Sequence, residues 1–334
     1  METKNMGYIP PFSLTNEMIQ LTSEISELLG SIKSADTLEK LPRLRRIGRI
    51  RTIHSSLAIE SNTLTMDQVT EIMAGRRVLG PPNEIKEVKN AFAAYNELER
   101  IDAFAIDDLL RIHRMMMDDL VEENGRFRSV NAGVYTGDGR LIHAAPQPGL
   151  IRDHMKDLFE WLTTSDVHML IRSSVFHYEF EFIHPFRDGN GRMGRFWQTV
   201  ILMKWKPVFA WIPIESVIHD RQAEYYAAIA DSTKAGNSND FIIYMLKAIR
   251  DAVMKIVSEV RDHINHVDIR VHKLLAVLGP HPMTAAELME RLRLRSRDSF
   301  LKNYIRPAIE AGLVSATMPD RPTNRNQRYF RKIE

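Results

Sequence analysis

The 334-residue sequence contains no cysteine, which excludes disulfide bonds, thiolate nucleophiles and thiolate metal sites. No uninterrupted apolar run reaches the roughly 18 residues that a membrane-spanning helix needs. The N-terminus, METKNMGYIPPF, lacks the basic start and apolar core of a signal peptide, so we expect a cytoplasmic protein without membrane contact. The formal net charge is only +2, and this balance by itself indicates no particular partner.

Hydrophobic residues spaced by three and four positions recur along most of the chain and predict a mainly α-helical fold. Thr65 is the expected N-cap of a short helix ending near Gly75, and Pro81-Pro82-Asn83 should break the chain before a helix that begins at Glu84. The other predicted helices cover residues 14–32, 41–59, 106–120, 149–163, 168–182, 190–204, 215–234 and 239–265, and the one from Glu84 ends near residue 100.

The segment from Arg128 to Pro148 departs from this periodicity. It contains Thr136-Gly137-Asp138-Gly139 between two arms with apolar residues, and Asp-Gly in such a position is a strong β-hairpin signal. We therefore expect one β-hairpin, at about residues 130–148, within a helical domain.

The C-terminal stretch 268–334 changes in character. Three short helices are expected there, followed by strands at 314–317 and 328–330, and this order is the outline of a winged helix, a helix-turn-helix variant. The stretch carries 13 Lys and Arg against 7 Asp and Glu, a net charge of +6. The three helices are expected near residues 269–279, 284–293 and 296–311.

A basic winged helix permits DNA binding through residues 268–334. Arg297, Lys302 and Arg306 would then lie on a recognition helix near Ser296–Ile309. The alternative is a structural or dimerising module, because many winged helices contact protein.

Residues suited to catalysis are most concentrated in HPFRDGNGRMGR, residues 184–195. One interpretation is a dinucleotide-binding turn, because the three glycines of this segment spell G-x-G-x-x-G and Glu215 follows at a suitable distance for a ribose contact. However, the residues before the glycines fit a helical face equally well, the turn would be too long, and no other parallel-strand runs could complete a sheet.

The other interpretation is a phosphate-binding loop between two helices. Pro185 ends the first helix, and Gly189 to Gly191 allow backbone N–H groups to converge on an anion where the next helix begins, near Asn190. Arg192 and Arg195 lie three positions apart on one face of that helix and supply forked cationic donors.

Two further residues add chemistry to this loop. Asp188 is placed to hold Mg²⁺ through its carboxylate, and His184, with an ordinary pKa near 6.5, is a candidate general base. Together with the arginines, they suit phosphoryl or nucleotidyl transfer.

The segment matches the Fic family signature, His-x-Phe-x-Asp/Glu-Gly-Asn-Gly-Arg-x-x-Arg, at every fixed position. The chain thus resembles this family from its N-terminal helices to about residue 260. The resemblance implies a Fic-type helical bundle with one hairpin, called the flap, followed by the winged helix. The implied domains are an N-terminal helical region at 1–100, a catalytic core at 101–265 and the C-terminal module at 268–334.

The resemblance also implies an activity, protein adenylyltransfer. AMP would pass from ATP to a Tyr, Thr or Ser hydroxyl of a target protein or of the enzyme itself. His184 would take the hydroxyl proton, and Phe186 would anchor the loop in the core. Asp188 would bind Mg²⁺ bridging the α- and β-phosphates. ATP would be held by Gly189, Asn190, Gly191, Arg192 at the β-phosphate and Arg195 at the γ-phosphate.

Two other regions gain a role from the resemblance. The hairpin at 133–145 would dock an extended target segment by strand addition. Tyr225 and Tyr226 resemble a pair near the adenine pocket, with core packing as the alternative for each.

The stretch from His54 to Asn62 resembles the family's inhibitory motif, Ser/Thr-x-x-x-Glu-Gly/Asn, through Ser56 and Glu60, although Ser61 stands where Gly or Asn is usual. The segment 41–62 would then be an inhibitory helix, with Glu60 occupying the Arg195 donor that the γ-phosphate needs, so that ATP binds misaligned. The alternatives for Glu60 are a surface carboxylate with local partners or a residue that positions water for removal of AMP.

The sequence leaves other functions open. A relative could transfer another phosphate-containing group, although Arg195 favours a triphosphate donor. A transcription regulator that uses the Fic fold only as a nucleotide sensor is the alternative from a different class, and His184 argues against it because a sensor needs no base. A homodimer is left open.

Overall fold

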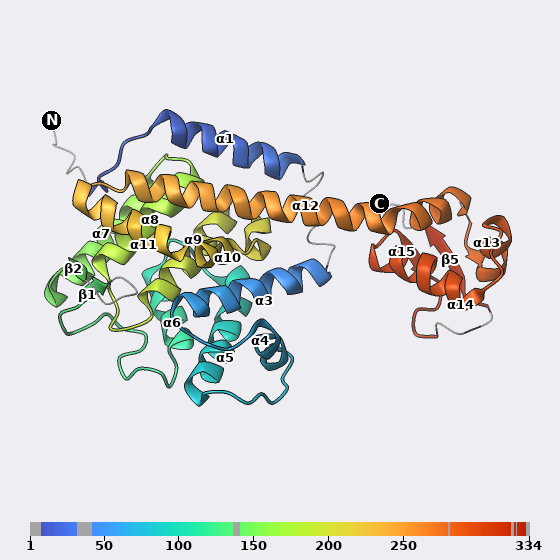
Figure 1. The fold of residues 1–334 in the computed structure, drawn as a ribbon, viewed down its shortest axis with the longest axis horizontal. Coiled ribbons are helices and arrows are strands. Elements are labelled where there is room, and N and C mark those ends of the chain that lie inside the picture. The colour runs from blue at the N-terminus through green and yellow to red at the C-terminus, as the bar shows by residue number, and fades with distance from the viewer. Residues whose placement is uncertain are drawn as a thin grey trace. The chain divides into compact units, whose positions relative to one another are not determined.

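The computed structural model describes residues 8–31, 42–135, 141–279, 281–321, 324 and 326–331. The chain divides into two compact units, which we call the first unit (Met1–Leu29 and Arg46–Met254) and the second unit (Gly30–Arg45 and Lys255–Glu334). The predicted mainly helical class is confirmed (Figure 1). Within the described ranges, none of the helices combines the length and apolarity that a membrane span requires.

The first unit is built from helices and one hairpin (Figure 1). Its helices, with α12 continuing into the second unit, are α1 (Asn16–Ser31), α3 (Pro42–Ile59), α4 (Met66–Met73), α5 (Pro82–Asn96), α6 (Ile106–Met116), α7 (Ile151–Thr164), α8 (Met169–Ile183), α9 (Asn190–Trp205), α10 (Ile214–Asp220), α11 (Gln222–Ala235) and α12 (Asn239–Val277), with single 3-10 turns at Leu98–Arg100, Pro148–Leu150 and Pro207–Trp211.

The capping prediction for α4 is confirmed. The Thr65 side chain accepts a hydrogen bond from the backbone N–H of Gln68, and the Gln68 side chain accepts one from the N–H of Thr65, which completes a capping box.

Four of the predicted helices were wrong in their limits. Helix α5 already begins at Pro82, because proline is compatible with the first helical turn, where its missing N–H needs no partner. The single helix expected at 215–234 is two helices that meet at Arg221. The helices expected at 239–265 and 269–279 are one helix of 39 residues, α12, since no glycine or proline interrupts it before Gly279.

The hairpin consists of β1 (Gly133–Tyr135) and β2 (Leu141–Ala144), which are antiparallel with Gly133 opposite Ala144. The register shifts between Val134 and Tyr135. The turn predicted at residues 136–139 lies outside the described residues.

Helices α8 and α9 pack on each other and form the centre of the first unit. Nearly every side chain of α8 is buried, whichever way it faces, as expected of a helix surrounded by protein. Because α9 follows α8 after a loop of only six residues, this loop is held at both ends by rigid helices.

The second unit contains a three-stranded antiparallel sheet with the order β3-β5-β4. The strands are β3 (Met283–Thr284), β4 (Val314–Ala316) and β5 (Arg328–Arg331), and the helical segments are α13 (Ala285–Arg291), α14 (Arg297–Phe300), a π-helical turn (Leu301–Ile305) and α15 (Arg306–Glu310). Strand β3 was not predicted, because two residues give too short a pattern to detect.

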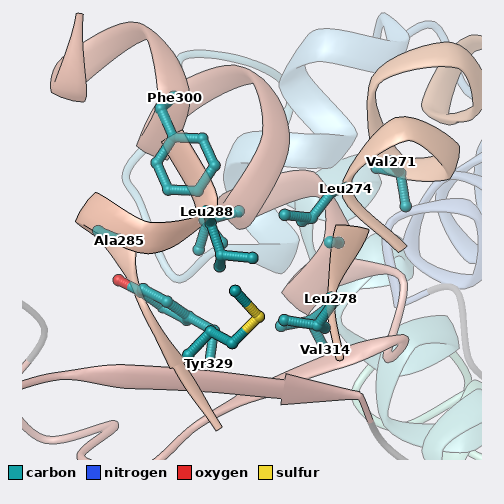
Figure 2. Close-up of a cluster of buried hydrophobic side chains, with 11 residues drawn as sticks. Val271, Leu274, Leu278, Ala285, Leu288, Phe300, Val314 and Tyr329 are labelled. Carbon is teal, nitrogen blue, oxygen red and sulfur yellow. The ribbon is translucent and has the colours of Figure 1, made fainter. Parts of the chain in front are cut away.

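Apolar side chains from the end of α12, the short helices and the sheet form one core for this unit (Figure 2). The core consists of Val271, Leu274, Leu278, Met283, Ala285, Leu288, Phe300, Ile305, Ala308, Val314 and Tyr329.

Candidate active site

The loop between α8 and α9 begins and ends in the left-handed backbone conformation. His184, the C-cap of α8, has φ 50° and donates its backbone N–H to the carbonyl of Phe180 at 2.9 Å. Gly189, the N-cap of α9, has φ 83° and provides no side chain to cap the helix. The first N–H groups of α9 therefore have no side-chain cap and form a positively polarised end that suits an anion.

The middle of the loop is fixed by Phe186 and Asn190. Phe186 is fully buried, and its ring stacks on the imidazole of His113 with ring centroids 3.7 Å apart. The Asn190 side chain accepts a hydrogen bond from the Phe186 N–H and donates one to the Phe186 carbonyl, both at 2.8 Å. The side chain of Asn190 thus closes the loop, and its backbone is the part left to face a ligand.

His113 holds the other side of the loop and was missed by sequence reasoning. Its Nδ1 accepts a hydrogen bond from the Gly125 N–H at 2.8 Å, so its proton is on Nε2, which donates to the carbonyl of Asp188 at 3.0 Å. Burial lowers the pKa of His113 to about 4, which keeps the ring neutral at pH 7. A lone histidine within a helical pattern gives no signal for this role.

The imidazole of His184 is largely enclosed. Burial lowers the pKa of His184 to about 4, although the carbonyl of Glu181 offsets part of this effect. Its Nδ1 is buried and has no hydrogen-bond partner in the described part of the chain. The ring is neutral at pH 7 and can accept a proton, as a general base must.

Arg195 is almost completely buried and is held by the end of α3. Its Nη2 donates to Glu60 Oε1 at 2.8 Å and to the carbonyl of Ser56 at 2.9 Å, and its Nε donates to the Ser56 hydroxyl at 3.2 Å. Burial opposes the charge, but the Glu60 carboxylate outweighs it and raises the pKa of Arg195 overall. The fold thus brings Ser56 and Glu60 to the motif from more than 130 positions away.

Glu60 lies in the turn directly after α3. The carbonyl of Leu57 accepts hydrogen bonds from the N–H groups of both Glu60 and Asn62, at 2.9 and 3.1 Å, and Ser61 between them has φ 70°. This left-handed position at a helix end favours Gly or Asn, which accounts for the family preference that Ser61 departs from.

Arg192 is also buried and paired with carboxylates. Its Nη1 donates to Glu87 Oε1 at 2.9 Å and its Nη2 to Asp188 Oδ1 at 3.1 Å. Glu87 also accepts a hydrogen bond from Asn62 at 2.8 Å, so the chain after the turn at Glu60 is tied to Arg192 through Glu87. Glu87 is a second contributor that the sequence did not indicate, because it lies on α5, 105 positions away.

Two glycines of the motif are needed for close packing. A Cβ atom at Gly191 would collide with Glu60 Oε1 and lie 3.0 Å from Arg195 Nη1. A Cβ atom at Gly194 would lie 2.7 Å from Glu181 Oε1.

Glu181 and His177 form a buried neutral pair beside Gly194. Burial raises the pKa of Glu181 to about 8 and lowers the pKa of His177 to about 3, so both side chains are uncharged at pH 7. The Glu181 carboxyl and the His177 ring are 3.8 Å apart, and this approach is therefore not an ion pair at neutral pH.

The two tyrosines differ in position. Tyr225 is buried, and its hydroxyl lies 3.1 Å from Nε2 of His177, whose Nδ1 is bonded to Gln198 at 2.6 Å. Tyr226 is only partly buried. Tyr225 therefore belongs to a buried hydrogen-bond network with His177 and Gln198, whereas the side chain of Tyr226 is partly exposed.

Two family models match the chain: the Fic/DOC family over residues 101–202, and the C-terminal domain of Fic-like proteins (Filamentation induced by cAMP protein Fic-like) over residues 269–331. Among solved structures, a Fic family protein from Desulfovibrio desulfuricans G20 is 45% identical with a TM-score of 0.74, and the match covers 98% of this chain and 99% of that one.

Curated relatives carry the name protein adenylyltransferase. Fic-1 of Caenorhabditis elegans is 26% identical over 270 residues, covering 76% of this chain and 50% of the relative. Fic of Nematostella vectensis is 30% identical over 205 residues, covering 57% and 45%. The chain spans about half the length of these curated relatives.

Proposed function

This chain belongs to the Fic family, and we propose that it transfers AMP from ATP to a Tyr, Thr or Ser hydroxyl of a target protein or of itself. The observation that carries the proposal is a neutral, proton-accepting imidazole, His184, at one end of a loop whose other end is the uncapped start of α9. The names of the curated relatives support the same activity.

In this reaction His184 accepts the proton of the target hydroxyl. The hydroxyl oxygen forms a bond to the α-phosphorus, the bond from that phosphorus to the β-phosphate oxygen breaks, and pyrophosphate leaves. The N–H groups at the start of α9, with Arg192 and Arg195, bind the phosphate oxygens. Tyr226 is the better placed of the two tyrosines to contact the base, because Tyr225 is held in the core.

Asp188 suits a magnesium ion bound together with the phosphates. Its side chain is 56% exposed, and its Oδ1 accepts from Arg192 and Gly189, while Oδ2 has no partner in the described residues. This arrangement agrees with Mg²⁺, which is commonly held by one or two carboxylates plus substrate phosphates and would supply positive charge beside them.

Glu60 inhibits this reaction by occupying Arg195. The ion pair of 2.8 Å takes the donor that the terminal phosphate requires, so ATP can bind only with its α-phosphate out of line. A second role for the same carboxylate is to orient water for removal of AMP. This role would appear as AMP release from a labelled target by the native protein and its loss in Glu60→Gly.

ATP labelled at the α-phosphate tests the proposed function. Glu60→Gly should increase protein labelling about 10- to 100-fold over the native chain, because Arg195 becomes available. Adding His184→Ala to that variant should reduce labelling about 10²- to 10⁴-fold, the usual contribution of a general base. Equal labelling by the native chain and Glu60→Gly would contradict the inhibitory role, and labelling that survives the loss of His184 would contradict the mechanism.

Binding to DNA is a second candidate function, carried by the second unit, whose three-stranded sheet and short helices agree with a winged helix. Arg297, Lys302 and Arg306 are all exposed and form no ion pair within the described residues. Each phosphate contact contributes about 0.9 to the slope of log affinity against log salt. Replacing all three cations by Gln should therefore lower the magnitude of that slope by up to about 3 in a mobility-shift titration. An unchanged slope would show that these three residues do not contact DNA.

A further inference from the structure

The side chain of Arg128 lies between the end of α8 and both ends of the hairpin. The residue is 2% exposed and forms no ion pair in the described part of the chain. Its guanidinium instead donates to backbone carbonyls: Nε to His184 at 2.7 Å, Nη1 to Val130 at 2.7 Å, and Nη2 to Pro146 at 2.6 Å and to Ile183 at 3.4 Å.

Two of these carbonyls, those of Ile183 and His184, lie at the C-terminal end of α8, where carbonyls have no hydrogen-bond donor within the helix. The last carbonyls of α8, including that of Ile183, have no intrahelical donor and form the negative end of the helix dipole, which a buried cation stabilises. The backbone N–H of Arg128 adds a hydrogen bond of 2.9 Å to the carbonyl of Pro185. These bonds help to hold His184 in its left-handed conformation, which costs a residue other than glycine about 1 kcal/mol.

The other two carbonyls precede and follow the hairpin. Val130 lies three residues before β1 and Pro146 two residues after β2. A single planar guanidinium, with five N–H donors in a fixed geometry, therefore joins the base of the hairpin to the backbone of the residue that carries the imidazole. A lysine ammonium in the same place is a point donor and could not maintain all of these directions.

We propose that Arg128 is a positioning residue for the transfer reaction. It fixes the distance between a target segment docked on the hairpin and the imidazole of His184. This inference rests on the proposed function, in which the hairpin holds the target and His184 takes its proton. A displacement of about 1 Å at a reacting centre can cost about 100-fold in rate, so loss of this connection should affect transfer strongly.

A positioning role for Arg128 differs from a purely structural role in its effect on nucleotide binding. Within the described part of the chain, the Arg128 side chain forms no hydrogen bond to the segment Gly189–Arg195 that would bind phosphate. The affinity for nucleotide should therefore stay constant while transfer falls. General damage to the fold would weaken both together.

The test uses the full chain with Glu60→Gly as the parent, and adds Arg128→Ala or Arg128→Lys. Labelling of the protein from ATP labelled at the α-phosphate should fall about 100-fold in Arg128→Ala and by a smaller factor in Arg128→Lys. The dissociation constant for α,β-methylene-ATP, measured by calorimetry, should change less than about twofold. Ethylguanidinium should restore part of the labelling in Arg128→Ala, because it can occupy the vacated space.

Arg172→Lys is the matched control. Arg172 lies near the start of α8 and likewise donates to two backbone carbonyls, those of Val167 at 3.1 Å and Leu162 at 3.2 Å, but these are remote from His184 along the helix. Its replacement should leave labelling at the level of the parent.

The outcomes separate the inference from the function it rests on. An unlabelled parent would reject the proposed function itself. If the parent is labelled and a folded Arg128→Ala or Arg128→Lys variant is labelled equally well, only the positioning role is rejected. The positioning role is also rejected if the affinity for nucleotide falls by the same factor as the labelling. If circular dichroism shows that Arg128→Ala does not fold, the rate of Arg128→Lys decides the question.

Discussion

The arginines of α9 and the cations of the second unit contrast sharply. Arg192 and Arg195 are buried and each contacts a carboxylate at about 2.8–3.1 Å, whereas Arg297, Lys302 and Arg306 are exposed without ion pairs in the described residues. A buried charge is tolerated only with well-placed partners, while an exposed charge remains hydrated and constrains its surroundings little. The first group is organised before any ligand arrives, and the second acquires a role only through a partner.

Uncharged side chains near Arg195 also distinguish the buried site from the exposed cations of the second unit. Near Arg195, burial also decides the protonation of Glu181, His177 and His184, which are uncharged at pH 7. Substitutions in the candidate active site should consequently change the stability of the fold or its dependence on pH. Substitutions of Arg297, Lys302 and Arg306, which we call the basic face, should change neither.

The largest effect is expected for Glu181→Gln as a function of pH. Burial raises the pKa of Glu181 from 4.5 to about 8, so the folded state retains a proton that the unfolded chain loses above pH 4.5. The contribution of Glu181 to stability is thus fully present below pH 4.5 and is lost as the pH rises to about 8. The native chain should lose a few kcal/mol relative to Glu181→Gln over this range, since one pKa unit corresponds to about 1.4 kcal/mol.

Urea unfolding of both chains at pH 5 and pH 8 measures this loss. Glu99→Gln, at an exposed position, serves as the control and should show no such trend. A stability difference that is the same at both pH values would show that Glu181 is already ionised in the folded state.

A smaller effect is expected for Gly191→Ala. The added methyl group must displace the Glu60 carboxylate, whose flexible end it would overlap, so we expect a loss of about 1–2 kcal/mol. The cost should decrease when Glu60 is already glycine, because the colliding carboxylate is then absent. A double-mutant cycle by thermal unfolding measures this coupling, and strict additivity would mean that the two positions do not touch.

Ser61→Gly should stabilise the chain by about 0.5–1 kcal/mol. Ser61 has φ 70°, a conformation that glycine adopts without steric cost. Ser26→Gly in the exposed face of α1 is the control with the opposite sign, because glycine within a helix is unfavourable. Thermal unfolding of the two variants should therefore give shifts in opposite directions, and a lower melting temperature for Ser61→Gly would contradict the argument.

The smallest effect is expected on the basic face. Replacing Arg297, Lys302 or Arg306 by Gln should change the free energy of unfolding by less than about 0.5 kcal/mol each, as is usual for exposed residues without partners. Unfolding experiments that gave a loss of several kcal/mol would remove the distinction between the two groups of cations.

Glycines, charges and helix ends in the sequence predicted the loop at 184–189 and the start of α9, whereas Glu60 was indicated only by the resemblance to the Fic inhibitory motif. The sequence did not indicate His113, Glu87 or Arg128, whose contacts to the loop and to α9 span 75, 105 and 56 positions. A side chain whose role depends on contacts with distant parts of the chain has no recognisable pattern in the sequence around it.

The helix limits show the same division between local and distant causes. The capping box at Thr65 was predictable because donor and acceptor are three residues apart. The break at Arg221 carries no glycine or proline and therefore escaped prediction. The absence of glycine and proline up to Leu278 permits α12 to continue past residue 265, but by itself it does not distinguish one long helix from two.

The contact between Glu60 and Arg195 also has a genetic consequence. Either codon for glutamate becomes a glycine codon through one base change, and Arg195 would keep both of its hydrogen bonds to Ser56 after that change. Under the proposed function, a variant of this kind that folds would no longer have its activity restrained by Glu60. A cell carrying this chain would be a single point mutation away from uncontrolled modification of its own proteins.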